Sequence, residues 1–253
     1  MKTLKIEYNI IGTIPLVWKR ELPECWDDLT PRQLLAISEM FCYNYKDYQF
    51  ISKLCRIPPF IAKRIHPFIT FQLLEELSFM HEFAPRNAII IKQMGDGAAP
   101  NPRLEGFDFG QFIFTDTYFQ DFSENNNDEH LHKFLAALYK PEGKKFNEKT
   151  IKQRVKHFEN VSRHKKQAVI INYGLIREWL QDVYPLVFPR PVQKEEERKN
   201  KLPKARTTGA WLKVFEAMVG DDIVNAEKYA RLPVHTAFRF ISKKIKEQRN
   251  GKR

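Results

Sequence analysis

Carboxylates and histidines are the residue types that would support acid–base catalysis or bind a metal, and the chain carries several close together in sequence. Asp27-Asp28 and Asp221-Asp222 are paired carboxylates, suited to general acid–base work or to a divalent cation. Both pairs lie where helices are predicted to begin. Carboxylates stabilise the helix dipole there, so capping is the favoured interpretation. His130 and His132 point about 200° apart on one helix, so they cannot share a metal.

No motif of an established catalytic site occurs in the sequence. Gly95-Asp96-Gly97 is too short for a phosphate loop and lacks the Gly-Lys-Ser/Thr that would follow it. The cysteines have neither the even number of a disulfide framework nor CxxC spacing, and they are Cys25, Cys42 and Cys55. We therefore expect a protein that is not an enzyme, with no catalytic residue, metal or cofactor.

Residues 107–122, FDFGQFIFTDTYFQDF, hold seven aromatic residues in sixteen positions. Aromatic faces can stack bases when they lie in a positively charged groove, where stacking contributes about 1–3 kcal/mol per base. From Leu104 to His130, however, there is no Lys or Arg and there are seven acidic residues, which would repel a phosphate backbone. The stretch is expected to be core or a protein-docking element, with these candidate contacts: Phe109, Phe112, Phe114, Tyr118 and Phe119.

A lysine-rich segment follows this stretch. Its lysines repeat at i, i+4, i+7 and i+11, which predicts one basic helix face made of Lys145, Lys149, Lys152 and Lys156. Ile151, Val155 and Phe158 predict the opposite, buried stripe. The basic face is expected to be solvated or to meet an acidic partner. The alternative is nucleic acid, contacted also through Lys165, Lys166 and the basic C-terminal tail.

The formal net charge of +11 is concentrated in three islands. Lys140–Lys166 carries +7, Arg190–Arg206 +4 and Arg239–Arg253 +6, so the rest of the chain is net −6. This distribution fits acidic protein partners or charge-segregated self-assembly as well as nucleic acid. No signal peptide is recognisable and no apolar run approaches the roughly 20 residues of a membrane span, so we expect a cytoplasmic protein with no membrane partner.

The predicted fold class is mainly α, with short proline-punctuated helices, a small N-terminal β element and a small C-terminal helical module. Residues 3–11 alternate polar and apolar, which predicts a strand, and prolines predict an irregular segment after it. Thr30, Pro31 and Gln33 have the spacing of a capping box and predict a helix over 31–43. Residues 87–92 are predicted to form a strand. Further helices are predicted over 45–56, 60–66 (broken by Pro67), 70–83, 129–139, 147–160, 165–183, 211–219, 222–231 and 234–249.

Four regions are predicted along the chain. Residues 1–100 form the N-terminal strand and helical module, and residues 101–188 form a central aromatic and basic helical region. Residues 189–207 have high charge and few apolar side chains, which is typical of an exposed linker. Residues 208–253 form the C-terminal helical module, which is small for an independent domain and is expected to dock on the main body or on a partner.

Five segments carry a resemblance to tail-assembly chaperones and related morphogenesis proteins of long-tailed bacteriophages. They are LPECWDDLTPRQLLAISEMF, FIFTDTYFQDF, LHKFLAALYKPEGKKF, WLKVFEAMVGDD and KYARLPVHTAFRFISKKIKEQ. The resemblance implies a non-catalytic protein of the host cytoplasm or the virion that binds other tail or baseplate proteins during assembly, or forms homo-oligomers. It adds Trp211 and Phe215 to the candidate partner contacts.

Overall fold

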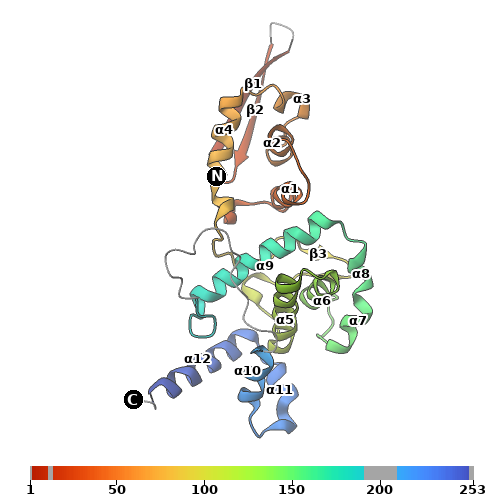
Figure 1. Ribbon diagram of the computed structural model, residues 1–253, viewed down its shortest axis with the longest axis vertical. Helices are drawn as coiled ribbons and strands as arrows, with labels where there is room; N and C mark the ends of the chain where they lie inside the picture. The colour runs from red at the N-terminus through yellow and green to blue at the C-terminus, as the bar shows by residue number, and fades with distance from the viewer. Residues whose placement is uncertain (1, 11–13, 191–209, 251–253) are drawn as a thin grey trace. The chain divides into compact units, whose positions relative to one another are not determined.

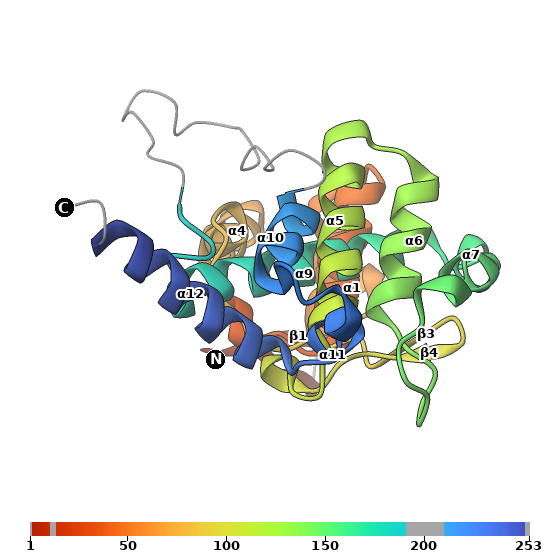
Figure 2. The same cartoon turned by 90° about the horizontal axis from the view of Figure 1, so that it is seen from below.

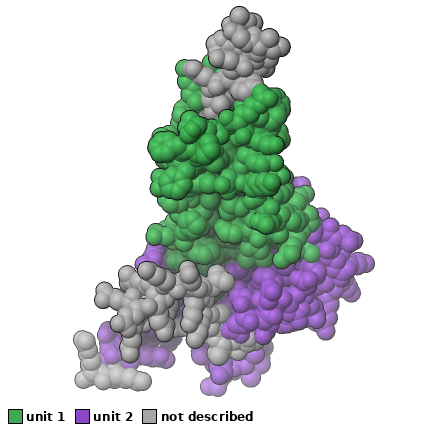
Figure 3. All heavy atoms as spheres, turned by 45° about the horizontal axis from the view of Figure 1, so that its top comes forward, with its two compact units in different colours: residues 1–86, 162–178 green, residues 87–161, 179–253 purple. Residues whose placement is uncertain are grey.

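The computed structural model describes residues 2–10, 14–190 and 210–250. Over these residues the chain is mainly α, as predicted, with four short or medium strands (Figure 1). It divides into two compact units, which Figure 3 shows in green and purple. Unit 1 comprises Met1–Arg86 and Ser162–Glu178, and unit 2 comprises Asn87–Val161 and Trp179–Arg253. Most of the predicted linker, residues 191–207, lies outside the described residues.

Unit 1 begins with an antiparallel hairpin of β1 (Lys2–Ile10) and β2 (Ile14–Leu22), with a register that runs from Lys2 opposite Leu22 to Ile10 opposite Ile14. The prediction of the first strand is confirmed, but the prediction of an irregular segment after it is wrong. Pro15 stands within β2, opposite Asn9. Each strand of a two-stranded ribbon has an open edge, where a residue without an N–H group is tolerated.

The helices of unit 1 are short, and prolines start several of them. They are η1 (Trp26–Asp28), α1 (Pro31–Cys42), α2 (Asp47–Cys55), α3 (Pro59–Ala62), α4 (Pro67–Glu76) and η2 (Ser78–His81). The capping box of α1 is confirmed: Gln33 N donates to Thr30 Oγ1 at 3.3 Å, and Thr30 N donates to Gln33 Oε1 at 3.0 Å. Pro67 does not break a helix but starts α4, at a position whose N–H has no helical partner in any case.

Trp26 anchors the core of unit 1. Its indole Nε1 donates to the Glu82 carbonyl at 2.7 Å, and its ring stacks on Phe83 with centroids 6.4 Å apart. Arg86 donates to the carbonyls of Trp26 and Leu29. Helix α9 (Arg163–Val183) contributes its residues up to Glu178 to this unit, where Leu175 O accepts a hydrogen bond from Arg86 N at 3.1 Å.

Among its described residues, unit 2 contains a minimal hairpin of β3 (Gln93–Met94) and β4 (Gly97–Ala98), and eleven helical segments or parts of them. Helices α5 and α6 lie side by side (Figure 2). Residues 87–92 are not a strand, and the predicted helix 147–160 is divided into three pieces. The helical segments are η3 (Pro102–Leu104), α5 (Phe109–Asn125), α6 (Asp128–Leu138), η4 (Glu148–Thr150), α7 (Ile151–Arg154), α8 (Lys156–Glu159), the last turn of α9, α10 (Ala210–Val219), η6 (Ile223–Asn225), α11 (Ala226–Ala230) and α12 (Val234–Asn250).

The C-terminal helices α10, α11 and α12 pack on α5 and complete the core of unit 2. Phe112 makes edge-to-face contacts with Trp211 and Phe238, with centroids 5.0 and 4.9 Å apart. The Trp211 indole Nε1 also donates to Asp116 Oδ2 at 2.7 Å, in a fully buried position. The C-terminal module therefore docks on the chain's own main body, which is one of the two outcomes expected for it.

Candidate functional site

The aromatic stretch 107–122 forms most of α5, and none of its seven rings is fully exposed. Phe109 and Phe112 have no solvent exposure, and Phe107 and Phe119 are also buried. The other three rings are half-buried: Phe114, Tyr118 and Phe122. The structure thus agrees with the core interpretation of Phe109, Phe112, Phe119 and the buried Trp211. Of the predicted partner contacts, Phe114, Tyr118 and Phe215 retain partly exposed rings.

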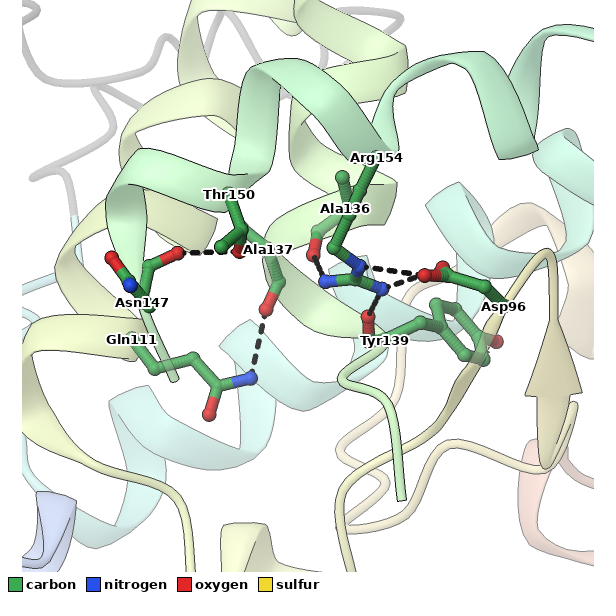
Figure 4. Close-up of polar contacts among 8 residues, drawn as sticks. All are labelled: Asp96, Gln111, Ala136, Ala137, Tyr139, Asn147, Thr150 and Arg154. Atoms are coloured by element: carbon green, nitrogen blue, oxygen red, sulfur yellow. Dashed lines mark hydrogen bonds and ion pairs between the residues drawn. The ribbon is translucent and has the colours of Figure 1, made fainter. Parts of the chain in front are cut away.

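Arg154 fixes the turn that follows α6 (Figure 4). Its guanidinium donates to both Asp96 oxygens at 2.9 and 2.8 Å, to the Ala136 carbonyl at 2.6 Å and to the Tyr139 carbonyl. The last carbonyls of a helix lack partners within the helix and favour a cation. Arg154 therefore caps α6 and ties the β3–β4 turn to it. The hydrogen bonds from Arg154 hold the pKa of Asp96 below its usual value.

The loop from Lys140 to Phe146 is fixed beyond this cap. Lys140 pairs with Ala98 through two backbone hydrogen bonds of 2.9 and 3.1 Å. Gly97 lies so close that a Cβ on it would stand 2.7 Å from the Tyr139 carbonyl, so only glycine fits. At the other end of the loop, the Phe146 ring lies 5.9 Å from that of Phe114. The loop that carries these lysines is thus held at both ends by contacts with the rest of unit 2.

A second ordered segment faces this loop and carries Arg231. Phe109 N donates to Leu232 O at 2.8 Å, and Val234 N donates to Phe107 O at 2.9 Å, so residues 232–234 pair with the start of α5. The Arg231 guanidinium donates to Glu227 Oε1 through Nε and Nη2 at 3.1 and 2.6 Å. This bond holds the pKa of Glu227 below its usual value, and the charge of Lys145 lowers it further.

An open pocket of about 480 Å³ lies between these segments, and we call it the cationic pocket. Its lining consists of Asp108, Lys140, Gly143, Lys144, Lys145 and Arg231. The described lining thus has four cations and one carboxylate, and Arg231 is in addition paired with Glu227. Within the described part of the chain, the ammonium groups of Lys140, Lys144 and Lys145 make no hydrogen bond or ion pair. Such a pocket can bind an anion that carries more than one charge.

The predicted lysine face is only partly present. Lys149, Lys152 and Lys156 are exposed. Of the predicted buried stripe, Ile151 and Phe158 are buried, as expected, and Val155 is half-buried. The prediction that Lys145 continues this face is wrong, because the helical segments begin only at Glu148, and Lys145 lines the cationic pocket instead. The two further predicted contacts, Lys165 and Lys166, are exposed and half-exposed on the part of α9 that belongs to unit 1.

Unit 1 exposes apolar side chains on α4. Phe68 and Phe71 are 61% and 57% exposed, and Ile69 is 46% exposed. Residues three apart lie on the same side of a helix, so Phe68 and Phe71 are neighbours there. We call Phe68, Ile69 and Phe71 the α4 apolar face. Leu73 and Leu77 are buried on the opposite side.

The paired carboxylates have local structural roles. Asp28 Oδ2 accepts a hydrogen bond from Glu24 N at 3.0 Å, which is the main cause of its lowered pKa. Asp222 accepts from the Asn225 amide at 2.8 Å and from the Tyr229 hydroxyl at 3.3 Å. Within the ranges 2–10, 14–190 and 210–250, no three His, Cys, Asp or Glu side chains form a group that could hold a metal ion. No helix in those ranges is both long and apolar enough to cross a membrane.

Sequence reasoning missed Asp108, Lys140, Lys144 and Arg231 as members of one site. Lys140, Lys144 and Lys145 surround a Pro-Glu-Gly turn, which was a signal for a basic loop. Arg231 lies about ninety positions further on, and no spacing connects it to that loop. Comparisons of the chain with protein-family models, with curated proteins and with solved structures found no match.

Proposed function

We propose that the protein is a non-catalytic binding protein that acts through protein–protein contacts made by unit 1. The observation that carries this proposal is the α4 apolar face. A helix that is apolar on both sides is normally covered on both sides, but α4 is buried or half-buried only along the side of Thr70, Leu73, Leu74 and the following Leu77. Large aromatic side chains that stay exposed next to one another are typical of a surface that another protein covers.

Charge indicates the chemistry of the partner. The chain contains no Asp or Glu from Tyr48 to Leu74, and Lys63, Arg64 and His66 are exposed directly before the α4 apolar face. A complementary surface would combine an apolar centre with an acidic rim. Complementary potentials speed association and disfavour wrong partners.

The setting that we propose is the assembly of a bacteriophage tail or baseplate. The resemblance of the segments LPECWDDLTPRQLLAISEMF and KYARLPVHTAFRFISKKIKEQ to tail-assembly chaperones supports it. The partner would then be another tail or baseplate protein, or a second copy of this chain. The protein would act in the host cytoplasm and either leave the particle or remain in the virion.

A double variant, Phe68→Ser with Phe71→Ser, tests the proposal. Each protein encoded by a flanking gene is co-expressed with the wild type and with the variant, and binding is measured with the purified pair. We expect at least tenfold weaker binding for the variant. Its folding free energy should change by only about 0.5 kcal/mol per site, because both residues are exposed.

Gln153→Ser is the matched control, since Gln153 is exposed and polar and lies in unit 2, outside the α4 apolar face. It should bind like the wild type. Undiminished binding by the double variant would refute the role of α4. The function itself would be refuted by a wild-type protein that is monomeric in light scattering and binds none of the flanking gene products.

Nucleic-acid binding is the second candidate function, and the exposed lysines favour it. Lys149, Lys152 and Lys156 lie exposed on one segment, and α12 carries further exposed cations: Lys243, Lys244, Lys246 and Arg249. Binding to duplex DNA should weaken by about 0.9 log unit per contacted phosphate for each log unit of salt. Absent or salt-independent binding would exclude this function.

A further inference from the structure

We propose that the cationic pocket of unit 2 is a binding site for a diphosphate group, held by Lys140, Lys144, Lys145 and Arg231. This inference stands independently of the assembly function, because it uses neither the α4 apolar face nor any residue of unit 1. It rests on the composition of the pocket, on the support of its two walls and on the fact that its lysines make no hydrogen bond or ion pair with any residue that the structure describes.

The residues that line the pocket favour a negatively charged ligand. None of the six lining residues has a large apolar or aromatic side chain, so the pocket offers nothing that would recognise a base, a ring or an aliphatic chain. Its lining carries three ammonium groups and one guanidinium group instead. A phosphate has several acceptor oxygens and can engage lysines as point charges and an arginine as a fork. A single carboxylate has fewer acceptor sites and one charge, so it would leave most of these cations unmatched.

The size fits two linked phosphates. A volume of about 480 Å³ lies within the usual range for small-ligand sites, roughly 300–1,000 Å³, and exceeds what one phosphate needs. Gly143 adopts φ +71°, and no atom lies within 4 Å of the place where a Cβ would be. The positive φ of this glycine allows the lysine loop to turn at that point.

The walls are ordered before any ligand arrives. Arg154 and the pairing of Lys140 with Ala98 hold the lysine loop, and Glu227 orients the Arg231 guanidinium. Binding to a preformed site loses less conformational entropy than binding to a mobile one. Among the described residues, the three lysines have no hydrogen bond or ion pair to break when an anion binds, although the charge of Lys145 also acts on Glu227.

Among the described lining residues, only Asp108 opposes an anion. It stands at the N-terminus of α5, but its side chain makes no capping hydrogen bond. Replacing it with asparagine therefore removes a negative charge from the pocket without removing a helix cap. If a diphosphate binds here, Asp108→Asn must strengthen the binding, whereas a lysine variant must weaken it.

Isothermal titration of the full chain with pyrophosphate at about 50 mM NaCl tests the proposal. We expect Lys144→Met and Lys145→Met each to weaken binding about tenfold, the scale of one charge-assisted hydrogen bond. Asp108→Asn should tighten binding about threefold or more. Lys156→Met and Glu124→Gln make the same charge changes at exposed positions outside the pocket, and should alter binding less than twofold.

Titrations with a single-stranded oligonucleotide and with an oligoglutamate peptide test which kind of anion the pocket binds. A single-stranded oligonucleotide that binds more tightly than pyrophosphate, with the same dependence on Lys144, would overturn the diphosphate assignment in favour of a phosphodiester backbone. Weaker binding of the oligonucleotide would assign it to a free diphosphate. The proposal would be overturned if neither pyrophosphate nor the oligonucleotide bound at low salt, or if the pocket variants and the control variants had equal effects. Tighter binding of an oligoglutamate peptide than of pyrophosphate would also overturn it.

Discussion

Replacing Arg154 with methionine should destabilise unit 2 by about 3–5 kcal/mol. The Arg154 side chain is 10% exposed and that of Asp96 is 27% exposed, so this ion pair lies between a surface pair and a fully buried one. The guanidinium serves three acceptors: the Asp96 carboxylate and the carbonyls of Ala136 and Tyr139. Each acceptor that loses its donor in a buried place costs about 1–3 kcal/mol. An exposed ion pair alone would contribute at most about 1 kcal/mol.

Urea unfolding followed by circular dichroism measures this cost, and hydrogen exchange locates it. The exchange protection of the Ala98 and Lys140 amides should fall most, because these amides bond to each other's carbonyls in the turn that Arg154 holds. Lys156→Met is the matched control: Lys156 is exposed two positions further on. A loss below about 1 kcal/mol for Arg154→Met, or equal losses for both variants, would refute the reasoning.

The pH dependence supplies a second test of the same contact. Because Arg154 lowers the pKa of Asp96 in the folded state, the contact stabilises the fold at a pH above the ordinary aspartate value of about 3.9. The stabilisation is lost as the pH falls through the lowered pKa, since the carboxylate must then be protonated. The difference in stability between wild type and Arg154→Met should therefore shrink below about pH 4. A difference that stays constant from pH 7 to pH 3 would contradict this role of Asp96.

Three further predictions concern the core of unit 2. Trp211→Phe should cost about 2–4 kcal/mol in urea unfolding, because it removes the donor to the buried Asp116 carboxylate and leaves a void. Tyr139→Phe should cost about 1–3 kcal/mol, because the Ile91 carbonyl loses its 2.7 Å hydrogen bond; no measurable loss would show that water replaces the hydroxyl. Gly97→Ala should lower the melting temperature, since its Cβ would stand 2.7 Å from backbone atoms, and an unchanged value would contradict that close approach.

Local signals predicted the helices best. The capping box of Thr30 and Gln33 involves residues three apart, so it could be read from the sequence and is present in the structure. The mainly α class followed from many such signals. The second strand of the hairpin was not predicted, because it is defined by its pairing with the first strand, which a local pattern does not reveal. Pro15 also favoured an irregular segment at this place.

The site required contacts that no local pattern carries. Arg231 meets the lysine loop only because residues 232–234 pair with the start of α5, far back along the chain. Likewise, the sequence of the aromatic stretch is compatible with core, interface or a stacking platform. The packing of α10–α12 on α5 decides between these interpretations. Binary patterning cannot separate these cases, because all three place aromatic residues at helical spacing.

The way in which unit 2 uses its charges links these observations. Two of the carboxylates in the aromatic stretch are buried: Asp116 accepts a hydrogen bond from Trp211, and Asp121 Oδ2 lies 3.2 Å from His130 Nδ1. Asp96 is likewise engaged by Arg154. The lysines of the cationic pocket have no such partners among the described residues. In unit 2 the carboxylates of Asp96, Asp116 and Asp121 therefore stabilise the fold, whereas the lysines of the cationic pocket remain available to an incoming anion.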